Sequence, residues 1–132
     1  MEEPEFWSDN DFNTLSGFYI NTGTNILKIS KIPNIAFHHD VFATKKQVKS
    51  ALAMARISQI MANDIEHFGG VVTDVEWGND DTPKYVICRN GYNVFTTAVT
   101  YTYYFLAFHT AEQRNLFLEK YLQLVKDYLM LS

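Results

Sequence analysis

Four histidines and a single cysteine are among the side chains of this sequence that could support catalysis or bind a metal. The most suggestive group is His38, His39 and Asp40, because imidazole and carboxylate are common zinc ligands. Adjacent residues of a strand point to opposite faces, so the two histidines could not hold one ion without a turn between them. No further ligand lies at a spacing that would help, and we predict no metal site.

Two further candidate sites fail on their spacing or surroundings. Residues 9–13 begin like a calcium-binding loop, but Thr14 stands where the turn glycine belongs and Ile20 where the closing glutamate belongs. Cys88 lies within an expected strand with only Arg89 beside it, which predicts a buried and inert thiol. The chain also has no glycine-rich phosphate loop, so we predict that it is not an enzyme and needs no cofactor.

The charged residues are segregated along the chain. Six carboxylates and no basic residue lie between positions 64 and 81, and they are Asp64, Glu66, Asp74, Glu76, Asp80 and Asp81. Residues 28–56 show the opposite charge, with Asp40 as the one carboxylate among Lys28, Lys31, Lys45, Lys46, Lys49 and Arg56. The ordinary interpretation is two solvated faces, because runs of charge usually mean only that.

A sharper interpretation makes the acidic run a binding site. Its members are Asp74, Glu76, Trp77, Asp80 and Asp81, which together would dock a basic surface of a partner protein. Thr73 and Glu76 match a capping box and predict one helical turn that carries Trp77 and stops at Gly78. Trp77 could instead pack inward, since a lone tryptophan on a loop often buries its ring.

A second candidate site has the opposite charge. Lys45, Lys46 and Lys49 lie within about one helical turn and could gather around a small anionic ligand, for instance a nucleotide signal. No other turn of the sequence supplies the cations that such a pocket would need. Ligand binding at these lysines is therefore the alternative to a protein-binding site.

Composition sets wider limits. With 132 residues, of which 47% are hydrophobic, the chain predicts one domain over residues 1–132, led by an acidic, aromatic segment over residues 1–16. The net charge of -4 disfavours direct binding to nucleic acid, and a single cysteine excludes an internal disulfide. There is neither a signal peptide nor a run of ~18 apolar residues, so we expect a cytoplasmic protein without a membrane partner.

Two strand-to-helix joints share one pattern. Thr110 with Gln113, and Thr44 with Gln47, each match a capping box that lies two residues after a phenylalanine. In such a box the threonine hydroxyl accepts from the glutamine amide, while the glutamine side chain reaches back to the threonine amide. A helix is therefore expected to begin at each joint.

These helices are expected near residues 45–68 and 110–131, and the apolar residues 103–108 predict a central strand before the second. Phe117 and Leu122 lie on the apolar rows of the second helix, so each is expected in the core. The first helix has a face of small and flexible side chains at helical spacing, namely Ala51, Met54, Ala55, Ser58, Met61, Ala62 and Ile65. We expect that face to be buried.

A hairpin precedes each joint. Residues 18–20 and 26–29 flank a short polar loop, and residues 85–89 and 92–95 meet at Asn90-Gly91, a strong hairpin signal. Both halves then run hairpin, strand, helix. The sequence predicts an α+β fold in which an antiparallel sheet is packed by two long helices, with a loose ββ(β)α pseudo-repeat.

A resemblance to known proteins rests on residues of the second half. They are Phe108, Thr110, Glu112, Phe117, Tyr121, Leu124 and Asp127-Tyr128-Leu129, preceded by a loop with Trp77 and Asp81 and by the strand Lys84-Tyr85-Val86-Ile87. This arrangement resembles small uncharacterised proteins of phages and mobile elements in gut Bacteroidetes. The resemblance covers residues 42–131 and implies a shared fold and a phage or mobile-element setting, without an active site.

Three functions follow as hypotheses. The first is a non-enzymatic phage or mobile-element protein that acts by binding, for instance as an inhibitor of a host protein or defence complex. The second is a protein that binds or sequesters a small nucleotide-type ligand. The third is a structural or accessory homo-oligomer, with a homodimer as its simplest form.

Overall fold

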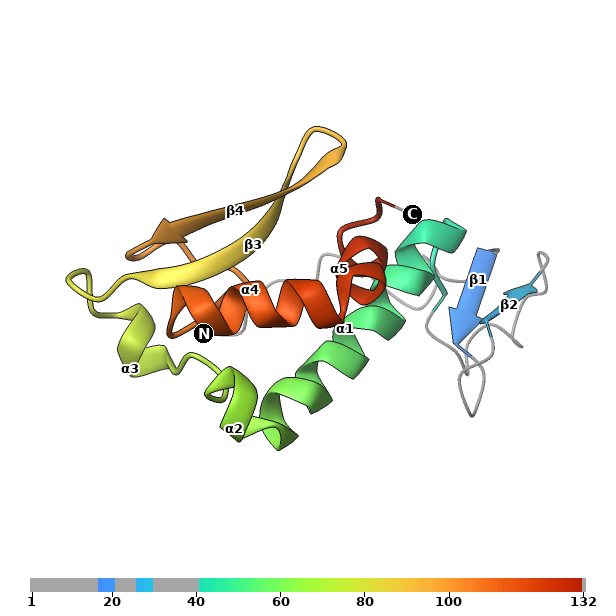
Figure 1. Ribbon diagram of the computed structural model, residues 1–132. Helices are drawn as coiled ribbons and strands as arrows, with labels where there is room; N and C mark the ends of the chain where they lie inside the picture. The colour runs from blue at the N-terminus through green and yellow to red at the C-terminus, as the bar shows by residue number, and fades with distance from the viewer. Residues whose placement is uncertain (1–16, 21–25, 30–40, 132) are drawn as a thin grey trace, which may run out of the picture. The chain divides into compact units, whose positions relative to one another are not determined.

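The computed structural model of this chain describes residues 17–20, 26–29 and 41–131 (Figure 1). Contacts within the chain divide it into two compact units, Met1–Leu52 and Ala53–Ser132. The calcium-like run, the acidic lead-in and the group His38, His39 and Asp40 lie outside the described residues. The prediction of one domain over the whole chain stays a prediction.

The first unit contains the predicted N-terminal hairpin. Strands β1 (Gly17–Ile20) and β2 (Ile26–Ile29) pair antiparallel, with Gly17 opposite Ile29. Phe42 then pairs with β1. The Phe18 amide donates to the Phe42 carbonyl at 2.8 Å, and the Phe42 amide donates to the Phe18 carbonyl at 2.7 Å. Gly17 has φ 144°, and a Cβ there would overlap the Phe42 carbonyl oxygen. This close return therefore requires glycine at position 17.

Helix α1 (Lys45–Asn63) begins at the predicted capping box and contains the boundary between the two units. The Gln47 amide donates to Thr44 Oγ1 at 3.1 Å, and the Thr44 amide donates to Gln47 Oε1 at 3.2 Å. The helix ends earlier than predicted, because Asp64 leaves helical geometry and its carboxylate accepts from the His67 amide, which starts α2 (Ile65–Phe68). Gly69, at φ 77°, closes α2 in the left-handed conformation that is common after a helix.

The sheet of the second unit confirms the α+β fold. Strands β3 (Lys84–Asn90), β4 (Asn93–Val99) and β5 (Ala107–Phe108) form an antiparallel sheet of order β4-β3-β5. Asn90 pairs with Asn93, and Gly91 takes φ 60° in the turn between them, as the Asn-Gly signal predicts.

The predicted central strand over residues 103–108 is wrong. Of this run only Ala107 and Phe108 form a strand, β5, which lies at one edge of the sheet, while β3 itself is central. The Ile87 amide of β3 also donates to the Leu106 carbonyl at 3.0 Å. The side chains of Leu106, Ala107 and Phe108 are nevertheless buried. Burial of an apolar run can come from covering helices as well as from neighbouring strands, and periodicity alone does not separate the two.

The C-terminal helix is divided in two. It forms α4 (Ala111–Lys120) and α5 (Leu122–Tyr128), so the prediction of one long helix over residues 110–131 is wrong. Its predicted capping box at Thr110 and Gln113 is present. Tyr121 leaves helical geometry without a glycine or proline beside it, and its ring centroid lies 5.0 Å from that of Phe117. Packing of this ring accompanies the break.

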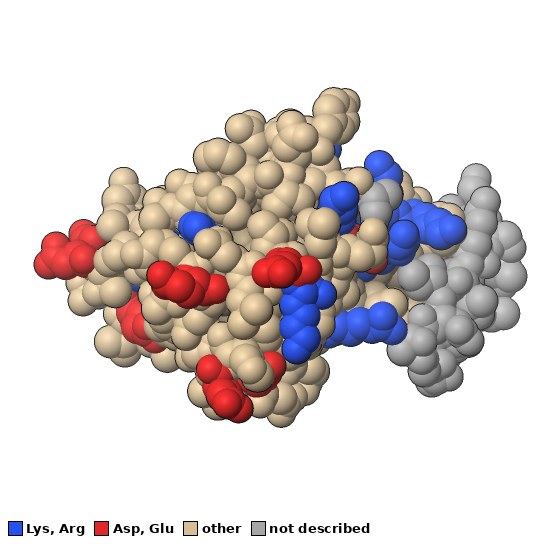
Figure 2. Space-filling model, in the orientation of Figure 1, with Lys and Arg blue, Asp and Glu red and all other residues tan. Residues whose placement is uncertain are grey.

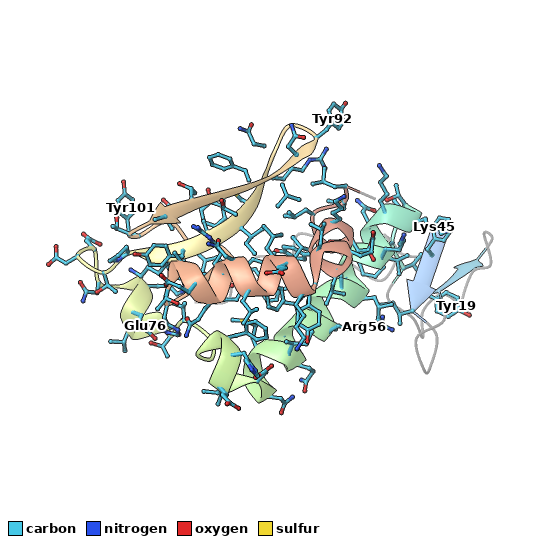
Figure 3. The ribbon with its side chains drawn as sticks, in the orientation of Figure 1. Tyr19, Lys45, Arg56, Glu76, Tyr92 and Tyr101 are labelled. Atoms are coloured by element: carbon cyan, nitrogen blue, oxygen red, sulfur yellow. The ribbon has the colours of Figure 1, made fainter. Side chains whose placement is uncertain are left out.

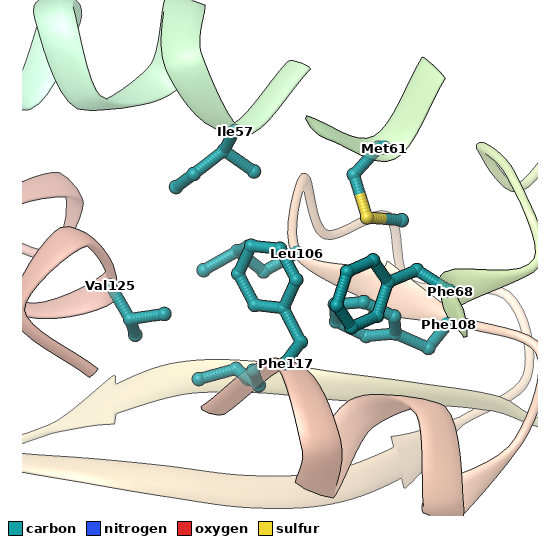
Figure 4. Packing of buried hydrophobic residues seen from close by; sticks show 8 residues of the cluster. Ile57, Met61, Phe68, Leu106, Phe108, Phe117 and Val125 are labelled. Atoms are coloured by element: carbon teal, nitrogen blue, oxygen red, sulfur yellow. The ribbon is translucent and has the colours of Figure 1, made fainter. Parts of the chain in front are cut away.

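The core of the second unit lies where the helices meet the sheet. Its buried side chains are Ile57, Met61, Phe68, Ile87, Leu106, Phe108, Phe117 and Val125. Figure 4 shows the aromatic rings of Phe68, Phe108 and Phe117 together, with Ile57 and Met61 reaching them from α1. Figure 1 shows α4 running beside β3, which it contacts.

The predicted buried face of α1 is largely wrong. Met61 is buried, but Met54, Ala55, Ser58, Ala62 and Ile65 are exposed. Ile57 is buried instead, and Ile60 packs against the core from its side. Burying these larger side chains removes more apolar area from water than burying alanine and serine.

Both units repeat one local joint. Phe42 pairs with Phe18, and Phe108 pairs with Tyr85, so each joint returns to the first strand of the hairpin before it. The helices that follow differ in length, with 19 residues in α1 and 10 in α4. A pseudo-repeat that extends beyond these joints stays a prediction.

Candidate functional site

The site is built on α3 (Asp74–Trp77), the single helical turn that the sequence predicts. The Glu76 amide donates to Thr73 Oγ1 at 3.3 Å, and the Thr73 amide donates to Glu76 Oε1 at 3.1 Å, which confirms the capping box. Gly78 ends the turn, as predicted. The short helix holds Asp74 and Trp77 in fixed positions on a connection that otherwise has no regular structure between α2 and β3.

Glu76 turns inward and contacts a histidine. Its Oε2 lies 2.8 Å from His109 Nε2, and each side chain is about one-third exposed. The amide of Thr73 and the hydrogen bond to His109 hold the pKa of the Glu76 carboxyl below its usual value, because both favour the ionised form. Glu76 therefore joins α3 to the end of β5, and it is not one of the freely exposed charges that the sequence indicates.

Trp77 is neither fully buried nor free. It packs against the small buried cluster of Val72, Val86 and Ala107, and its ring centroid lies 5.3 Å from that of Tyr103 with the planes tilted by 58°. Lys84 Nζ lies 5.4 Å from the same ring. The inward-packed alternative is thus partly correct, because Trp77 is half-buried.

Lys84 is the one fully buried charged residue in the part of the chain that the structure describes, with 2% exposure. Its ammonium donates to the Asn79 carbonyl at 2.8 Å and also to the Thr100 carbonyl. These bonds, with the Trp77 ring, replace the hydration that burial removes. Lys84 therefore ties the loop before β3 to the end of β4 beneath Trp77.

A pocket opens between α1, α3 and the segment before β5. Its volume is about 200 Å³, and its lining comprises Ser58, Met61, Val71, Val72, Asp74, Trp77, Tyr103, Tyr104, Phe105 and Ala107. Val71 and Tyr103 are 60% and 66% exposed, so the walls reach the surface. Most of the lining side chains are apolar or aromatic, Asp74 is the one carboxylate among them, and polar atoms also contribute to the pocket surface.

The five residues predicted for the partner-binding site divide into two groups by their exposure. Glu76 and Trp77 are half-buried, whereas Asp74, Asp80 and Asp81 are exposed. Figure 2 shows carboxylates over α3 and over the loop that leads to β3, with others over α2 and α4. The Asp81 amide donates to Asn79 Oδ1 at 3.0 Å, and this bond holds the loop in a turn. Lys84 donates to the carbonyl of the same Asn79. Asp74 thus lines the aromatic pocket, and Asp80 and Asp81 follow it on the same connection between α2 and β3.

The three lysines of the alternative ligand site do not lie at the aromatic pocket. Lys45 and Lys46 are exposed and Lys49 is half-buried, all within the first five residues of α1. None of them lines the aromatic pocket. A small-ligand site at these lysines stays a prediction.

The described residues also bear on the predictions for Cys88 and for a metal site. Cys88 is a half-buried free thiol, and burial raises its pKa, which disfavours the reactive thiolate. Over residues 17–20, 26–29 and 41–131 no three histidine, cysteine or acidic side chains are grouped so that they could hold a metal ion. In those same ranges no helix combines the length and the apolarity needed to cross a membrane.

Sequence reasoning missed five contributors to the site: Lys84, Tyr103, Tyr104, Phe105 and His109. The three aromatic residues belong to the run that predicts a central strand, so their lining of a pocket is hidden by their apolarity. Lys84 begins a strand and carries no local sign of burial. The contact between His109 and Glu76 joins residues far apart in the sequence, and no local pattern indicates it.

Comparisons of this chain with models of protein families, with curated proteins and with solved structures give no match.

Proposed function

We propose that this protein acts without catalysis, by binding a partner protein that presents a basic surface. We further propose that it is a phage or mobile-element protein and works in the cytoplasm of a bacterial host. An inhibitor of a host protein or defence complex fits this role. The phage setting rests on the sequence resemblance alone.

The observation that carries the proposal is the aromatic pocket beside exposed carboxylates. Protein interfaces typically have an apolar, aromatic centre and a polar rim. Trp77, Tyr103 and Tyr104 supply the centre, and Asp74, Asp80 and Asp81 supply charges for a rim. Val75, next to Asp74 on α3, is 85% exposed and adds an apolar side chain to the surface of this helix. A basic partner would find both parts complementary.

The size of the pocket disfavours the small-ligand alternative at this site. Pockets for drug-sized ligands and cofactors span roughly 300–1,000 Å³. This pocket holds about 200 Å³ and has a carboxylate at its edge, which would repel the phosphates of a nucleotide. It suits one side chain of a partner better.

Neutralising the exposed carboxylates tests the proposal. The variant Asp74→Asn/Asp80→Asn/Asp81→Asn keeps Glu76, because that carboxylate caps α3 and contacts His109. We expect the free energy of unfolding to change by less than about 1 kcal/mol per residue, since exposed charges contribute little. Affinity for the partner should fall by about tenfold or more, mainly through slower association. Tagged wild-type protein would capture the partner from a Bacteroidetes lysate, and affinities would then be measured with the purified pair.

A matched control carries the same change of charge elsewhere. Glu66, Glu112 and Glu119 are all exposed, so Glu66→Gln/Glu112→Gln/Glu119→Gln also removes three negative charges. This variant should bind the partner nearly as the wild type does. If both triple variants lose affinity equally, net charge and not the site governs binding. Wild-type affinity in the Asp74, Asp80 and Asp81 variant would contradict the proposal.

One observation favours a homo-oligomer as the second candidate. Strand β4 lies at an edge of its sheet and contains neither proline nor a charged residue, the devices that usually protect an edge from pairing. Phe95 on this strand is 44% exposed, and Tyr92 and Tyr101 flank it with 88% and 71% exposure. Figure 3 shows Tyr92 and Tyr101 at opposite ends of β4, both pointing outward. Antiparallel pairing of two β4 strands would give a symmetric dimer.

A charge on β4 tests this dimer. Ala98 is exposed, and Ala98→Lys would place a lysine on the edge strand of each copy, which disfavours the pairing of the edges. Sedimentation velocity at increasing concentration should show a dimer for the wild type and for the control Ala62→Lys, whose position on α1 is also exposed. The Ala98→Lys variant should stay monomeric. A wild type that remains monomeric at all concentrations would exclude the dimer.

A further inference from the structure

We propose that the aromatic pocket receives an arginine side chain of the partner, with the guanidinium group held against Trp77 and Tyr103 and paired with Asp74. This inference rests on the proposed function, since it names the group through which the basic partner is recognised.

The walls of the pocket supply aromatic faces. Trp77 and Tyr103 lie 5.3 Å apart between ring centroids and are tilted by 58°, so together they form an angled surface and not a closed stack. Tyr104 and Phe105 continue the lining. Aromatic faces attract cations through the ring quadrupole, and tryptophan does so most strongly. A cation that enters this pocket therefore meets favourable faces before any charge pairing.

The rest of the lining suits the stem of a long side chain. Met61, Val71 and Val72 are apolar, and Asp74 is the one charged group among the lining residues. Arginine has an apolar stem and a charged end, so its stem can cover apolar surface while its head reaches a carboxylate. The volume of about 200 Å³ is on the scale of a single side chain.

Arginine suits these rings better than lysine because the two cations differ in shape and hydration. The ammonium of Lys84 lies 5.4 Å from the Trp77 ring and is held by the carbonyls of Asn79 and Thr100, so any second cation at this ring is repelled to some extent. A lysine ammonium is a compact charge that also has to lose strongly bound water. A guanidinium spreads its charge over a plane, is less strongly hydrated, stacks on aromatic rings and can pair with a carboxylate through two bonds.

Trp77 itself reports on occupancy of the pocket. The chain has two tryptophans, so Trp7→Phe leaves Trp77 as the one tryptophan whose fluorescence is followed. The probes are the acetylated amides of arginine, lysine and norleucine, the last being uncharged and aliphatic. We expect the arginine probe to change Trp77 emission saturably at millimolar concentration, and to bind about tenfold more tightly than the norleucine probe. The lysine probe should bind more weakly than the arginine probe.

Two variants locate the binding. Asp74→Asn should weaken arginine binding several-fold and leave norleucine unchanged, whereas Glu119→Gln, an exposed carboxylate on α4, should have no effect. Tyr103→Ala removes one wall at an exposed position and should weaken arginine binding without unfolding the protein, as circular dichroism would show. Amide shifts in a two-dimensional NMR spectrum should be confined to the pocket lining.

The outcomes separate this inference from the proposed function. Equal binding of arginine and norleucine, lysine binding at least as tightly as arginine, or no saturable response overturns the arginine site. If the partner still binds and still depends on Asp74, Asp80 and Asp81, the proposed function stands without it. If the arginine probe binds while neutralising those carboxylates leaves partner affinity unchanged, the pocket holds a guanidinium but the proposed function fails, and the assignment of that arginine to the partner fails with it.

Discussion

Phe117→Ala is expected to lower the free energy of unfolding by about 3–5 kcal/mol, the range for removing a fully buried phenylalanine. The Phe117 side chain is fully buried, and its ring lies 5.1 Å from Phe68, 5.2 Å from Phe108 and 5.0 Å from Tyr121 between centroids. Its removal would leave a cavity bordered by three other aromatic rings from α2, β5 and the break after α4. Urea denaturation followed by circular dichroism would measure the change.

Leu122→Ala is the matched comparison. The sequence predicts Leu122 in the core together with Phe117, but the structure leaves it 44% exposed, so that prediction is wrong. We expect this substitution to cost about 1 kcal/mol or less, because only part of the side chain leaves an apolar environment. A loss below about 1 kcal/mol for Phe117→Ala as well would contradict the core described above.

Lys84→Ala is expected to cost about 2–4 kcal/mol, because it leaves two carbonyl groups without their donor and opens a small cavity. The acceptors are the carbonyls of Asn79 and Thr100, and the ammonium also lies over Trp77. Loss of these bonds should loosen the loop that carries Asp80 and Asp81. In the Trp7→Phe background, a red shift of Trp77 emission would report this loosening.

Lys84→Met separates the cost of the lost hydrogen bonds from the cost of the cavity. Methionine fills most of the space but donates no hydrogen bond, and it also avoids burying a charge, so its cost should be smaller than that of alanine. The exposed Lys46 provides a control, since Lys46→Met should change stability by less than about 0.5 kcal/mol. Wild-type stability in Lys84→Ala would show that the buried bonds contribute nothing net to folding.

The candidate site was accessible to sequence reasoning only in part. Thr73 and Glu76 predict the turn that carries Trp77, because a capping box depends on residues three apart. The same reasoning treats Glu76 as an exposed charge, whereas its carboxylate contacts His109. That contact depends on how α3 packs at the end of β5. Charge patterns along a chain identify carboxylates but not which of them face solvent.

The sequence by itself determined the features that depend on neighbouring residues. The capping boxes at Thr44, Thr73 and Thr110 and the turn at Gly91 all appear as predicted. The α+β class follows from the same signals. Each of these features is stabilised by hydrogen bonds or backbone preferences within a few residues, so a local pattern contains the necessary information.

The tertiary structure alone decided which apolar surfaces meet. It placed residues 107–108 at a sheet edge, ended α1 at Asn63, divided the last helix at Tyr121 and selected Ile57 for the core. It also buried Lys84 beneath Trp77 and turned Tyr103 to Phe105 into the lining of a pocket. Apolar burial is non-directional and roughly proportional to area, so several arrangements satisfy the same hydrophobic pattern. Contacts between residues far apart in the chain choose among them.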